Sequence, residues 1–532
     1  MKKVVSLLLA VVLLAGVLPV MAAAEETSST WLSDELVEIH VMREENASQV
    51  IQSDSVKIQY IEKLLNIKLV VEAVPAASYA DKKQVLIATD NMPDLIKVTA
   101  DDVRTYARDG MFVCLSDYRD QLPNFFAAYE SKESNMMLNV DGKCYAAPTL
   151  RRPSENDSRF LIGGQLPVIR IDLLEKYGLE VPTTFDELYD VLMVFKENNP
   201  DCIPLTNRKG GSTTATQKLL DTMAYSLGSG STMYYDEDLG GVWVYGPANE
   251  NFKEVLRYLN KLYEAGLLDP DYATNTVDLW KEKMSSGKAL MYFDNNGFAS
   301  QFNIALQTID PSYELQVIPT MTNSLGQTRN FMYSMDWTDQ LWAIPASTEN
   351  LDVCLKFLDW CYSDEGADVN GYGEPGVTFE YVDGKPRILE SVLEKYAASG
   401  SSTAYYDIQS DLGVGLLDLA PYVDIGCQVQ MQNYLMTAEE LEKYEYVSAL
   451  LEADEGLRQP VSVNPPLTAE QTERYNELKT AVVNICSQEW DKYIMGVEPI
   501  DNYDNVIAAA REAGATEMEQ IYNDAWNAAL GK

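Results

Sequence analysis

Short apolar strands alternate with helices in the first hundred residues, and this alternation limits the possible folds more than any other feature of the chain. The apolar patterns predict, in order, a strand at 36–42, a helix at 55–65, a strand at 67–74, a helix at 77–88 and a strand at 94–98. Helices between strands are typical of βαβ units, in which neighbouring strands run parallel. The sequence therefore predicts an α/β fold on a mainly parallel sheet, with any ligand beyond the carboxyl ends of its strands.

The chain is too long for one hydrophobic core. With 532 residues, 46% of them hydrophobic and 23% charged, it has an ordinary globular composition and is expected to form two lobes. Residues 1–24 are excluded from the fold, because two lysines, an apolar run at 4–20 and three alanines at 22–24 are typical of a signal peptide. A membrane anchor is the alternative interpretation, but the apolar run is short and ends in small residues that suit cleavage.

The helix expected to start at Phe185 is the most clearly marked element. Thr184 and Glu187 have the spacing of a capping box, and Pro200 follows the end of the helix. Apolar side chains recur at helical spacing along one face, at Phe185, Leu188, Leu192 and Phe195. The segment around this helix is therefore the best basis for a comparison with known families.

The order DGKCYAAP at 141–148, followed by IRIDLLEKYGLEVPTTFDELYDVLMVFK at 169–196, resembles the family 1 extracellular solute-binding proteins of ABC importers. The pattern is most similar to the large oligosaccharide-binding, LplA-like branch, which also includes alginate-binding proteins. Stretches at 259–270, 286–291 and 357–366 fit the same pattern in the same order. The resemblance implies a two-lobed periplasmic-binding-protein-like (type II) fold. In that fold each lobe is a mainly parallel sheet flanked by helices, and the ligand lies in a cleft between the lobes.

The resemblance also implies how the chain is divided. The expected segments are 25–147 and 294–340 for lobe 1, and 148–293 and 341–532 for lobe 2. The C-terminal helices could pack back on lobe 1. A strand at 288–293 is expected to lead back into lobe 1, where residues 315–319 would form a further strand.

Most catalytic chemistry is excluded by the residue types present. The chain has one histidine, His40, which lies in a predicted strand, so a multi-histidine metal site is impossible. No phosphate-binding GxxxxGK[ST] loop is present, and the glycine pairs at 163–164 and 210–211 lack the dinucleotide fingerprint. Carboxylate-pair chemistry such as glycoside hydrolysis stays open, but no motif singles out a pair among 81 acidic residues. No cofactor is expected.

The formal net charge of −40 limits the possible partners. Nucleic acids and anionic membrane surfaces require a basic protein surface, so both are excluded. The same charge argues weakly against a highly anionic ligand such as a uronate polymer, because long-range steering would be repulsive. A well-solvated exported surface is the simpler interpretation.

Neither the cysteines nor the acidic loops predict a metal site. The seven cysteines include no CxxC spacing, and Cys354 and Cys361 would lie about 10 Å apart along one helix, too far for a disulfide. Some relatives bind calcium in an acidic loop between the capped helix and the IPL strand that follows it. Here the segment at 198–203 supplies one carboxylate, Asp201, and is too short for a cage of about six to eight oxygens. Calcium is therefore not predicted at this position.

Aromatic residues are the first candidates for ligand contact, since sugar rings pack their C–H faces on aromatic rings. The chain has 8 Trp and 32 Tyr. The predicted stacking residues are, in order of preference, Trp337, Trp342, Trp280, Tyr145, Tyr372 and Trp243. The predicted polar contacts are Asp101 and Asp102 after the third strand, Asn295 in the polar turn at 294–298, and Arg170, which the resemblance implies to face the cleft. The alternative, structural interpretations are core packing of the aromatic rings, helix capping by the aspartates and an Arg170–Asp172 ion pair.

These features predict an exported binding protein that captures an oligosaccharide by lobe closure and presents it, as a monomer, to an ABC transporter permease. Many relatives carry a lipid-bearing cysteine after Leu-Ala-Gly, but here Val17 follows Leu14-Ala15-Gly16. We therefore expect a protein in the periplasm, at the cell surface or outside the cell, without lipid at that point. Two alternatives stay open, a binder of the same fold for a peptide or polyol and an exported glycan-degrading enzyme. The sugar, its length and its linkage are left open.

Overall fold

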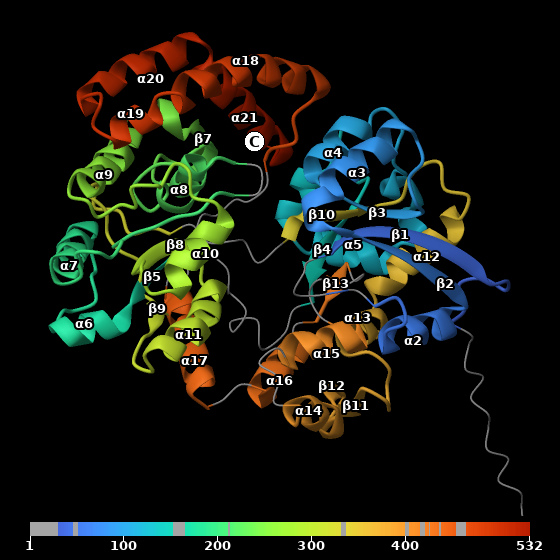
Figure 1. Cartoon of the computed structure of the whole chain (residues 1–532). Helices are drawn as coiled ribbons and strands as arrows, with labels where there is room; N and C mark the ends of the chain where they lie inside the picture. The colour runs from blue at the N-terminus through green and yellow to red at the C-terminus, as the bar shows by residue number, and fades with distance from the viewer. Residues whose placement is uncertain are drawn as a thin grey trace, which may run out of the picture.

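Two lobes stand side by side in the computed structural model of the chain (Figure 1). The N-terminal lobe, in blue, is on the right, the second lobe, in green, is on the left, and the red C-terminal helices lie across the top. The structure describes residues 30–45, 50, 52–152, 165–210, 213–330, 337–399, 404–414, 421–424, 426–435, 438–453 and 464–531. The predicted signal peptide, 1–24, lies outside the described residues.

The first lobe is built on a sheet with the strand order β13-β4-β10-β3-β1-β2. The strands are β1 Val37–Glu45, β2 Ile67–Pro75, β3 Leu95–Val98, β4 Ala147–Arg151, β10 Trp337–Ala343 and β13 Tyr422–Val423. β1 pairs in parallel with β2 and β3, and β13 pairs in parallel with β4. β10 is antiparallel to both β3 and β4. Among these six strands only β10 therefore runs in the opposite direction, and the predicted βαβ units are confirmed.

Helices cover both faces of this sheet and bury its apolar side chains. They are α2 Val56–Leu65, α3 Ala76–Ala88, α4 Ala100–Tyr106, η1 Leu115–Gln121, α5 Pro123–Glu130, η2 Glu133–Leu138, α12 Leu351–Cys361 and α13 Asp364–Tyr372. Ile39 and Met42 of β1 and Ile96 of β3 are fully buried in the core of this lobe. Cys354 and Cys361 of α12 lie in the same core as free thiols.

Apart from β13, the sheet of the second lobe repeats the strand arrangement of the first. Its longest strands are β5 Gln165–Arg170, β8 Met291–Asn295 and β9 Leu315–Val317, and β5 is antiparallel to both β8 and β9. Single parallel bridges extend the sheet, from Ile203 to Ala289 and from Leu205 to Leu268. The strand after 202 thus lies between the strand at 268 and β8. In each lobe one antiparallel strand is inserted between the third and fourth parallel strands.

The helices of the second lobe and a small hairpin surround this sheet. They are α6 Ile171–Tyr177, α7 Phe185–Asn198, α8 Ala215–Met223, β6 Met233–Asp236, β7 Val242–Tyr245, η4 Gly246–Ala248, α9 Phe252–Glu264, α10 Val277–Ser285, α11 Gly297–Ile309 and α17 Ala438–Ala453. α7 begins where the capping signal predicts, because Thr184 Oγ1 accepts a hydrogen bond from the backbone N–H of Glu187 at 3.1 Å. The Glu187 carboxylate bonds the backbone N–H of Thr183 at 2.7 Å instead of that of Thr184.

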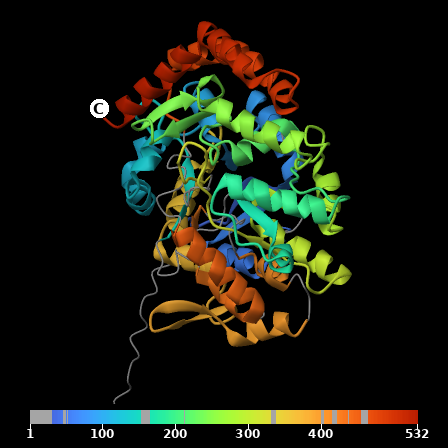
Figure 2. The same ribbon diagram turned by 90° about the vertical axis from the view of Figure 1, so that its left-hand side faces the viewer.

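The C-terminal helices span the two lobes, and we call them the C-terminal strap. They are α18 Ala469–Ser487, α19 Trp490–Ile494, η5 Ile500–Asn502, α20 Tyr503–Glu512 and α21 Ala515–Ala529. Their apolar side chains complete the core of the second lobe, while Trp526 and Leu530 also contact the core of the first. Arg104 of α4, in the first lobe, donates to the backbone oxygen of Asn464 at 2.6 Å. Figure 2 shows the strap arching over the top of the molecule.

A subdomain with its own core lies below the first lobe (Figures 1 and 2). It contains β11 Phe379–Val382, β12 Lys385–Ile388, α14 Glu390–Ala397, α15 Ala404–Leu412 and α16 Gly426–Leu435. Arg152, just after β4, pairs with Asp368 at 2.5 Å and with Asp424. This arginine therefore joins the end of the first sheet to α13 and to the segment that leads into α16.

The division of the chain between the lobes differs from the expected one. The strand at 315–319 was expected in lobe 1, but β9 pairs with β5 of the second sheet, so that prediction is wrong. β8 leads into α11, which packs in the second lobe, so the chain does not return to lobe 1 at that point. α12 and α13, expected in lobe 2, pack on the first sheet. The physical reason is backbone pairing, because β9 pairs with β5 of the second sheet and the chain joins the first sheet again only at β10.

Candidate ligand site at the carboxyl edge of the second sheet

Polar side chains meet where the parallel strands of the second sheet end. The strand after Ile203 continues into Asn207 and Arg208, and β8 ends in Asp294 and Asn295. β5 runs the opposite way, so its first residue, Gln165, pairs with Asn295 at the same edge. Ligands of α/β sheets bind beyond this edge. We call Gln165, Arg208, Lys218, Asp294 and Asn295 the edge cluster.

Arg208 and Asp294 form the centre of the edge cluster. Arg208 Nε lies 2.7 Å from Asp294 Oδ2, and Arg208 Nη2 lies 3.1 Å from Asp294 Oδ1. The side chains are 18% and 4% exposed, respectively. The guanidinium carbon lies 5.2 Å from the ring centre of Phe298 and 5.5 Å from that of Trp280. A two-pronged ion pair over two aromatic rings holds the guanidinium plane in one orientation.

Lys218 of α8 adds a second cation to this edge. Its Nζ lies 3.4 Å from Gln165 Oε1 and 3.9 Å from Asp294 Oδ1. Burial lowers the pKa of Lys218, Asp294 opposes this shift, and Arg208 adds to it. The edge cluster thus combines carboxylate, amide, ammonium and guanidinium groups at one end of the sheet. Such groups can donate to and accept from the hydroxyl groups of a sugar.

A large part of the chain, which includes the edge cluster, matches the model of a known protein family. Residues 51–368 match the model of the family described as bacterial extracellular solute-binding protein, which is more than half of the chain. The chain belongs to this family. Within the described residues of the solute-binding protein, none of the helices has the length and apolar character needed to cross a membrane.

Curated relatives extend the similarity over most of the chain. The polygalacturonan/rhamnogalacturonan-binding protein YtcQ of Bacillus subtilis is 25% identical over 487 residues, which cover 89% of this chain and 88% of YtcQ. The fructooligosaccharide ABC transporter substrate-binding protein FusA of Streptococcus pneumoniae is 24% identical over 317 residues, which cover 56% of each chain.

Solved structures show the same fold. The alginate-binding protein AlgQ2, in a crystal structure without calcium ion, has a TM-score of 0.70 and 21% identity, over 94% of this chain and 99% of AlgQ2. An EF-hand mutant of S. pneumoniae FusA, in complex with fructo-nystose, has a TM-score of 0.66 and 17% identity, over 93% of this chain and 99% of FusA. The solute-binding protein therefore has the expected two-lobed, periplasmic-binding-protein-like fold.

Of the predicted contact residues, Asn295 lies in the edge cluster and Trp280 lies directly beneath it. Asn295 Oδ1 accepts from the backbone N–H of Gly297 at 2.8 Å and so shapes the turn after β8. Trp280 is 0% exposed, with its ring packed edge-on against Tyr292, Phe298 and Phe302. Its ring faces are covered by protein, so a sugar cannot stack on Trp280 in this conformation. For this conformation, the predicted stacking is wrong. The side chain supports Arg208 instead.

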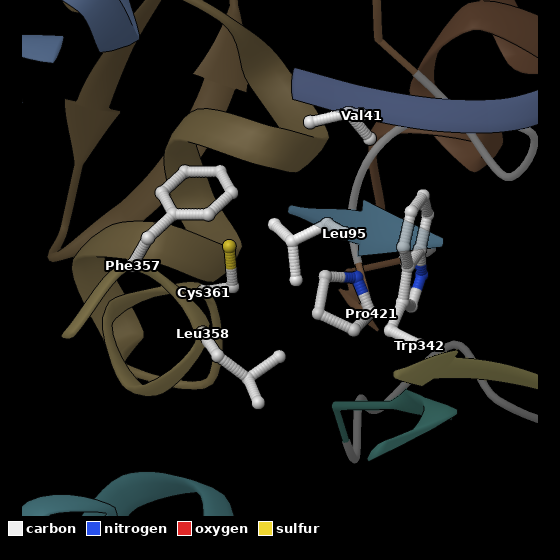
Figure 3. Close-up of a pocket in the computed structure, with 7 residues that line it drawn as sticks. All are labelled: Val41, Leu95, Trp342, Phe357, Leu358, Cys361 and Pro421. Atoms are coloured by element: carbon white, nitrogen blue, oxygen red, sulfur yellow. The ribbon is translucent and has the colours of Figure 1, made fainter. Parts of the chain in front are cut away.

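Trp342, the second choice for stacking, lies in the core of the first lobe. It lines a small, mostly apolar pocket between the sheet and α12 (Figure 3). The other residues that line this pocket are Val41, Leu95, Phe357, Leu358, Cys361 and Pro421. The lining is mostly apolar and offers few partners for sugar hydroxyls, so this pocket is a packing gap in this conformation. Trp337, the first choice, begins β10, but its side chain lies outside the described residues.

The remaining aromatic candidates are spread over the molecule. Trp243 is buried in the second lobe, where its ring packs against Tyr522 and Trp526 of α21. Tyr372 is buried at the end of α13 and donates to Asp424 Oδ1 at 3.4 Å. In this conformation both residues pack in the protein core, which is the structural alternative to ligand contact. Tyr145 is half-buried in the first lobe, and its contact with a ligand stays a prediction.

Asp101 and Asp102 follow β3, as expected, but have different roles. Asp102 Oδ2 accepts from the backbone N–H of Thr99 at 2.8 Å and pairs with Lys83, so it completes a capping box for α4. Helix capping, the structural alternative, is therefore confirmed for Asp102. Asp101 is 83% exposed and pairs with Arg104 at 3.0 Å. Its contact with a ligand stays a prediction.

Arg170 lies at the opposite edge of the second sheet from the edge cluster. Because β5 is the antiparallel strand, its last residue sits where the parallel strands begin. Arg170 is buried and bonds Asp172 through Nε and Nη2, both at 2.6 Å, with its guanidinium carbon 3.8 Å from the ring centre of Tyr313. The structural ion pair is therefore confirmed. Its predicted contact with a ligand is wrong for this conformation.

Arg208, Lys218 and Asp294 were not among the predicted contact residues. Two local signals could have identified the first and last of them. Arg208 comes three residues after Leu205 of the IPL strand, and Asp294 directly follows the apolar run at 289–293. Polar residues immediately after a predicted parallel strand belong to the binding edge of an α/β sheet.

Proposed function

We propose that this protein captures an oligosaccharide between its two lobes and delivers it to the permease of an ABC transporter. The observation that carries the proposal is the edge cluster, where a fixed Arg208–Asp294 pair and Lys218 lie at the binding edge of the second sheet. Its aromatic support, Trp280 and Phe298, lies directly below. The names of the relatives, which include polygalacturonan-, alginate- and fructooligosaccharide-binding proteins, agree with a carbohydrate ligand.

Capture would follow from contacts that form only when the lobes close. The ligand first meets one lobe and then biases the closed state by contacts with the second lobe. A binding role rather than catalysis is proposed, because the fold is that of solute-binding proteins and no motif singles out a reactive pair of carboxylates. We also propose that the protein is exported with removal of residues 1–24 and that it acts as a monomer.

A selective thermal shift is the expected result of mixing residues 25–532 with the correct oligosaccharide. A ligand present at about a hundred times its dissociation constant adds roughly 2.7 kcal/mol to the free energy of unfolding, and so raises the melting temperature. Acidic and neutral oligosaccharides both belong in the panel, since the relatives are named for alginate, polygalacturonan and fructooligosaccharides.

The recovered sugar provides the control for that experiment. Chromatography should return the ligand at its original length, because a binding protein releases what it takes up. Shortened products would instead support the glycan-degrading enzyme. A panel of sugars without any shift, together with a shift from a peptide or polyol, would contradict the carbohydrate proposal.

A further inference from the structure

The turn that follows α7 is short and tightly bonded. The backbone N–H of Asn199 donates to the backbone oxygen of Phe195 at 2.9 Å, which closes the last turn of the helix. The backbone N–H of Cys202 then donates to the backbone oxygen of Asn199 at 3.0 Å. Ile203 already pairs with the rest of the sheet, through the backbone oxygen of Lys288 at 2.8 Å. Only residues 199–202 therefore separate the helix from the strand that leads to Arg208.

Lys196 places its ammonium group on the inner side of this turn. Its Nζ donates to the backbone oxygen of Pro200 at 2.9 Å and to that of Cys202 at 3.1 Å. Lys196 lies in the last turn of α7, where the helix dipole and the terminal carbonyl groups favour a cation. The ammonium thus gathers backbone oxygens from both sides of Asp201, as a bound metal ion would.

The residues of this turn do not fit calcium, the ion that some relatives hold at this position. Calcium takes about six to eight oxygen ligands, several of them from carboxylates. Residues 198–203 hold one carboxylate, Asp201, which is exposed, and the backbone oxygens of Pro200 and Cys202 already face Lys196. A divalent ion on those two oxygens would also lie within a few ångströms of the ammonium, and like charges repel strongly at that distance.

We infer that Lys196 is a built-in cation that holds this turn in the place where some relatives hold calcium, and that the turn therefore needs no calcium. The turn fixes the start of the strand that carries Asn207 and Arg208 to the edge cluster. A covalently attached ammonium does this at any calcium concentration. The inference rests on the contacts of Lys196 and not on the proposed ligand.

Thermal unfolding of residues 25–532 in EDTA and in millimolar calcium chloride tests the first half of the inference. The expected result is the same melting temperature in both solutions, and calorimetric titration with calcium chloride should show no binding heat. A higher melting temperature in calcium, or a lower one in EDTA, would overturn the inference.

The variant Lys196→Met tests the second half. Loss of two bonds from the ammonium to backbone oxygens should lower the melting temperature by at least about 2 °C. Lys288→Met is the matched control, because it removes an exposed ammonium next to the same turn, and it should melt like the unchanged protein. Lys196→Arg keeps the positive charge and should lose less than Lys196→Met. Equal melting temperatures for Lys196→Met and Lys288→Met would contradict the role of Lys196.

Discussion

Replacement of Lys283 by methionine is expected to lower the free energy of unfolding by about 3–5 kcal/mol, because it leaves a buried carboxylate without its cation. Lys283 Nζ lies 3.0 and 2.9 Å from the two carboxylate oxygens of Asp269. It also donates to Asp271 Oδ2 at 3.0 Å and to Asn275 Oδ1 at 2.8 Å. Asp269 is fully buried, so water cannot replace the lost ammonium.

The Asp269 carboxylate is the centre of this network. Besides Lys283, it accepts from Thr206 Oγ1 at 2.6 Å and from Asn275 Nδ2 at 2.8 Å. Burial alone would raise the pKa of Asp269, but the hydrogen bonds from Thr206, Lys283 and Asn275 outweigh burial and lower the pKa. The carboxylate therefore stays charged, and removal of Lys283 leaves this buried charge with neutral hydrogen-bond donors only.

Urea unfolding gives the measurement, as a lower midpoint with an unchanged slope. The matched control is Lys281→Met, which removes an exposed lysine from the same helix, α10, and should stay within about 0.5 kcal/mol of the unchanged protein. The double variant Asp269→Asn with Lys283→Met removes both charges and should recover part of the loss. If Lys283→Met and Lys281→Met unfolded at the same urea concentration, the network around Asp269 would not stabilise the fold.

Loss of the Arg208 guanidinium is expected to weaken oligosaccharide binding by at least roughly 30-fold, the factor that corresponds to about 2 kcal/mol. Arg208→Met removes the guanidinium donors from the edge cluster and leaves Asp294, which is almost fully buried, without its main cation. Asp294→Asn should weaken binding in the same direction, because Arg208 then loses its two-pronged partner. Calorimetric titration with the sugar that the thermal screen identifies measures both effects.

Arg170→Met is the matched control for this prediction. Arg170 and Asp172 form the same kind of two-pronged pair, but at the opposite edge of the same sheet. Arg170→Met should therefore lower the melting temperature while the folded protein keeps its affinity for the sugar. A comparable loss of affinity in Arg170→Met and Arg208→Met would place the ligand away from the edge cluster.

Local signals in the sequence predicted the elements of this structure well. The capping residue Thr184 and the apolar face of the helix that follows it placed α7 correctly. The strands that alternate with helices in residues 36–98 formed the expected parallel units. These signals are short-range, because capping and side-chain periodicity depend on residues a few positions apart.

Long-range pairing explains what the sequence did not predict. Whether β9 joins the first or the second sheet depends on its pairing with β5, more than a hundred residues earlier. The direction of β5 also decides that Arg170 faces away from the binding edge. Trp280 was expected at the surface of a binding site, but its indole is enclosed by Tyr292, Phe298 and Phe302. None of these partners is visible in the local pattern around each residue.

The C-terminal strap has a consequence for the order in which the chain folds. The backbone N–H of Trp243 bonds Asn523 Oδ1 at 2.8 Å, and that of Tyr245 bonds Glu519 Oε1 at 2.9 Å, so β7 acquires these partners only from the last helix. Contacts across such long stretches of chain form slowly. The parallel units of the first lobe can form early, whereas the second lobe stays incomplete until α21 has been synthesised. The core of the second lobe is therefore expected to close last, after α21 has docked on β7.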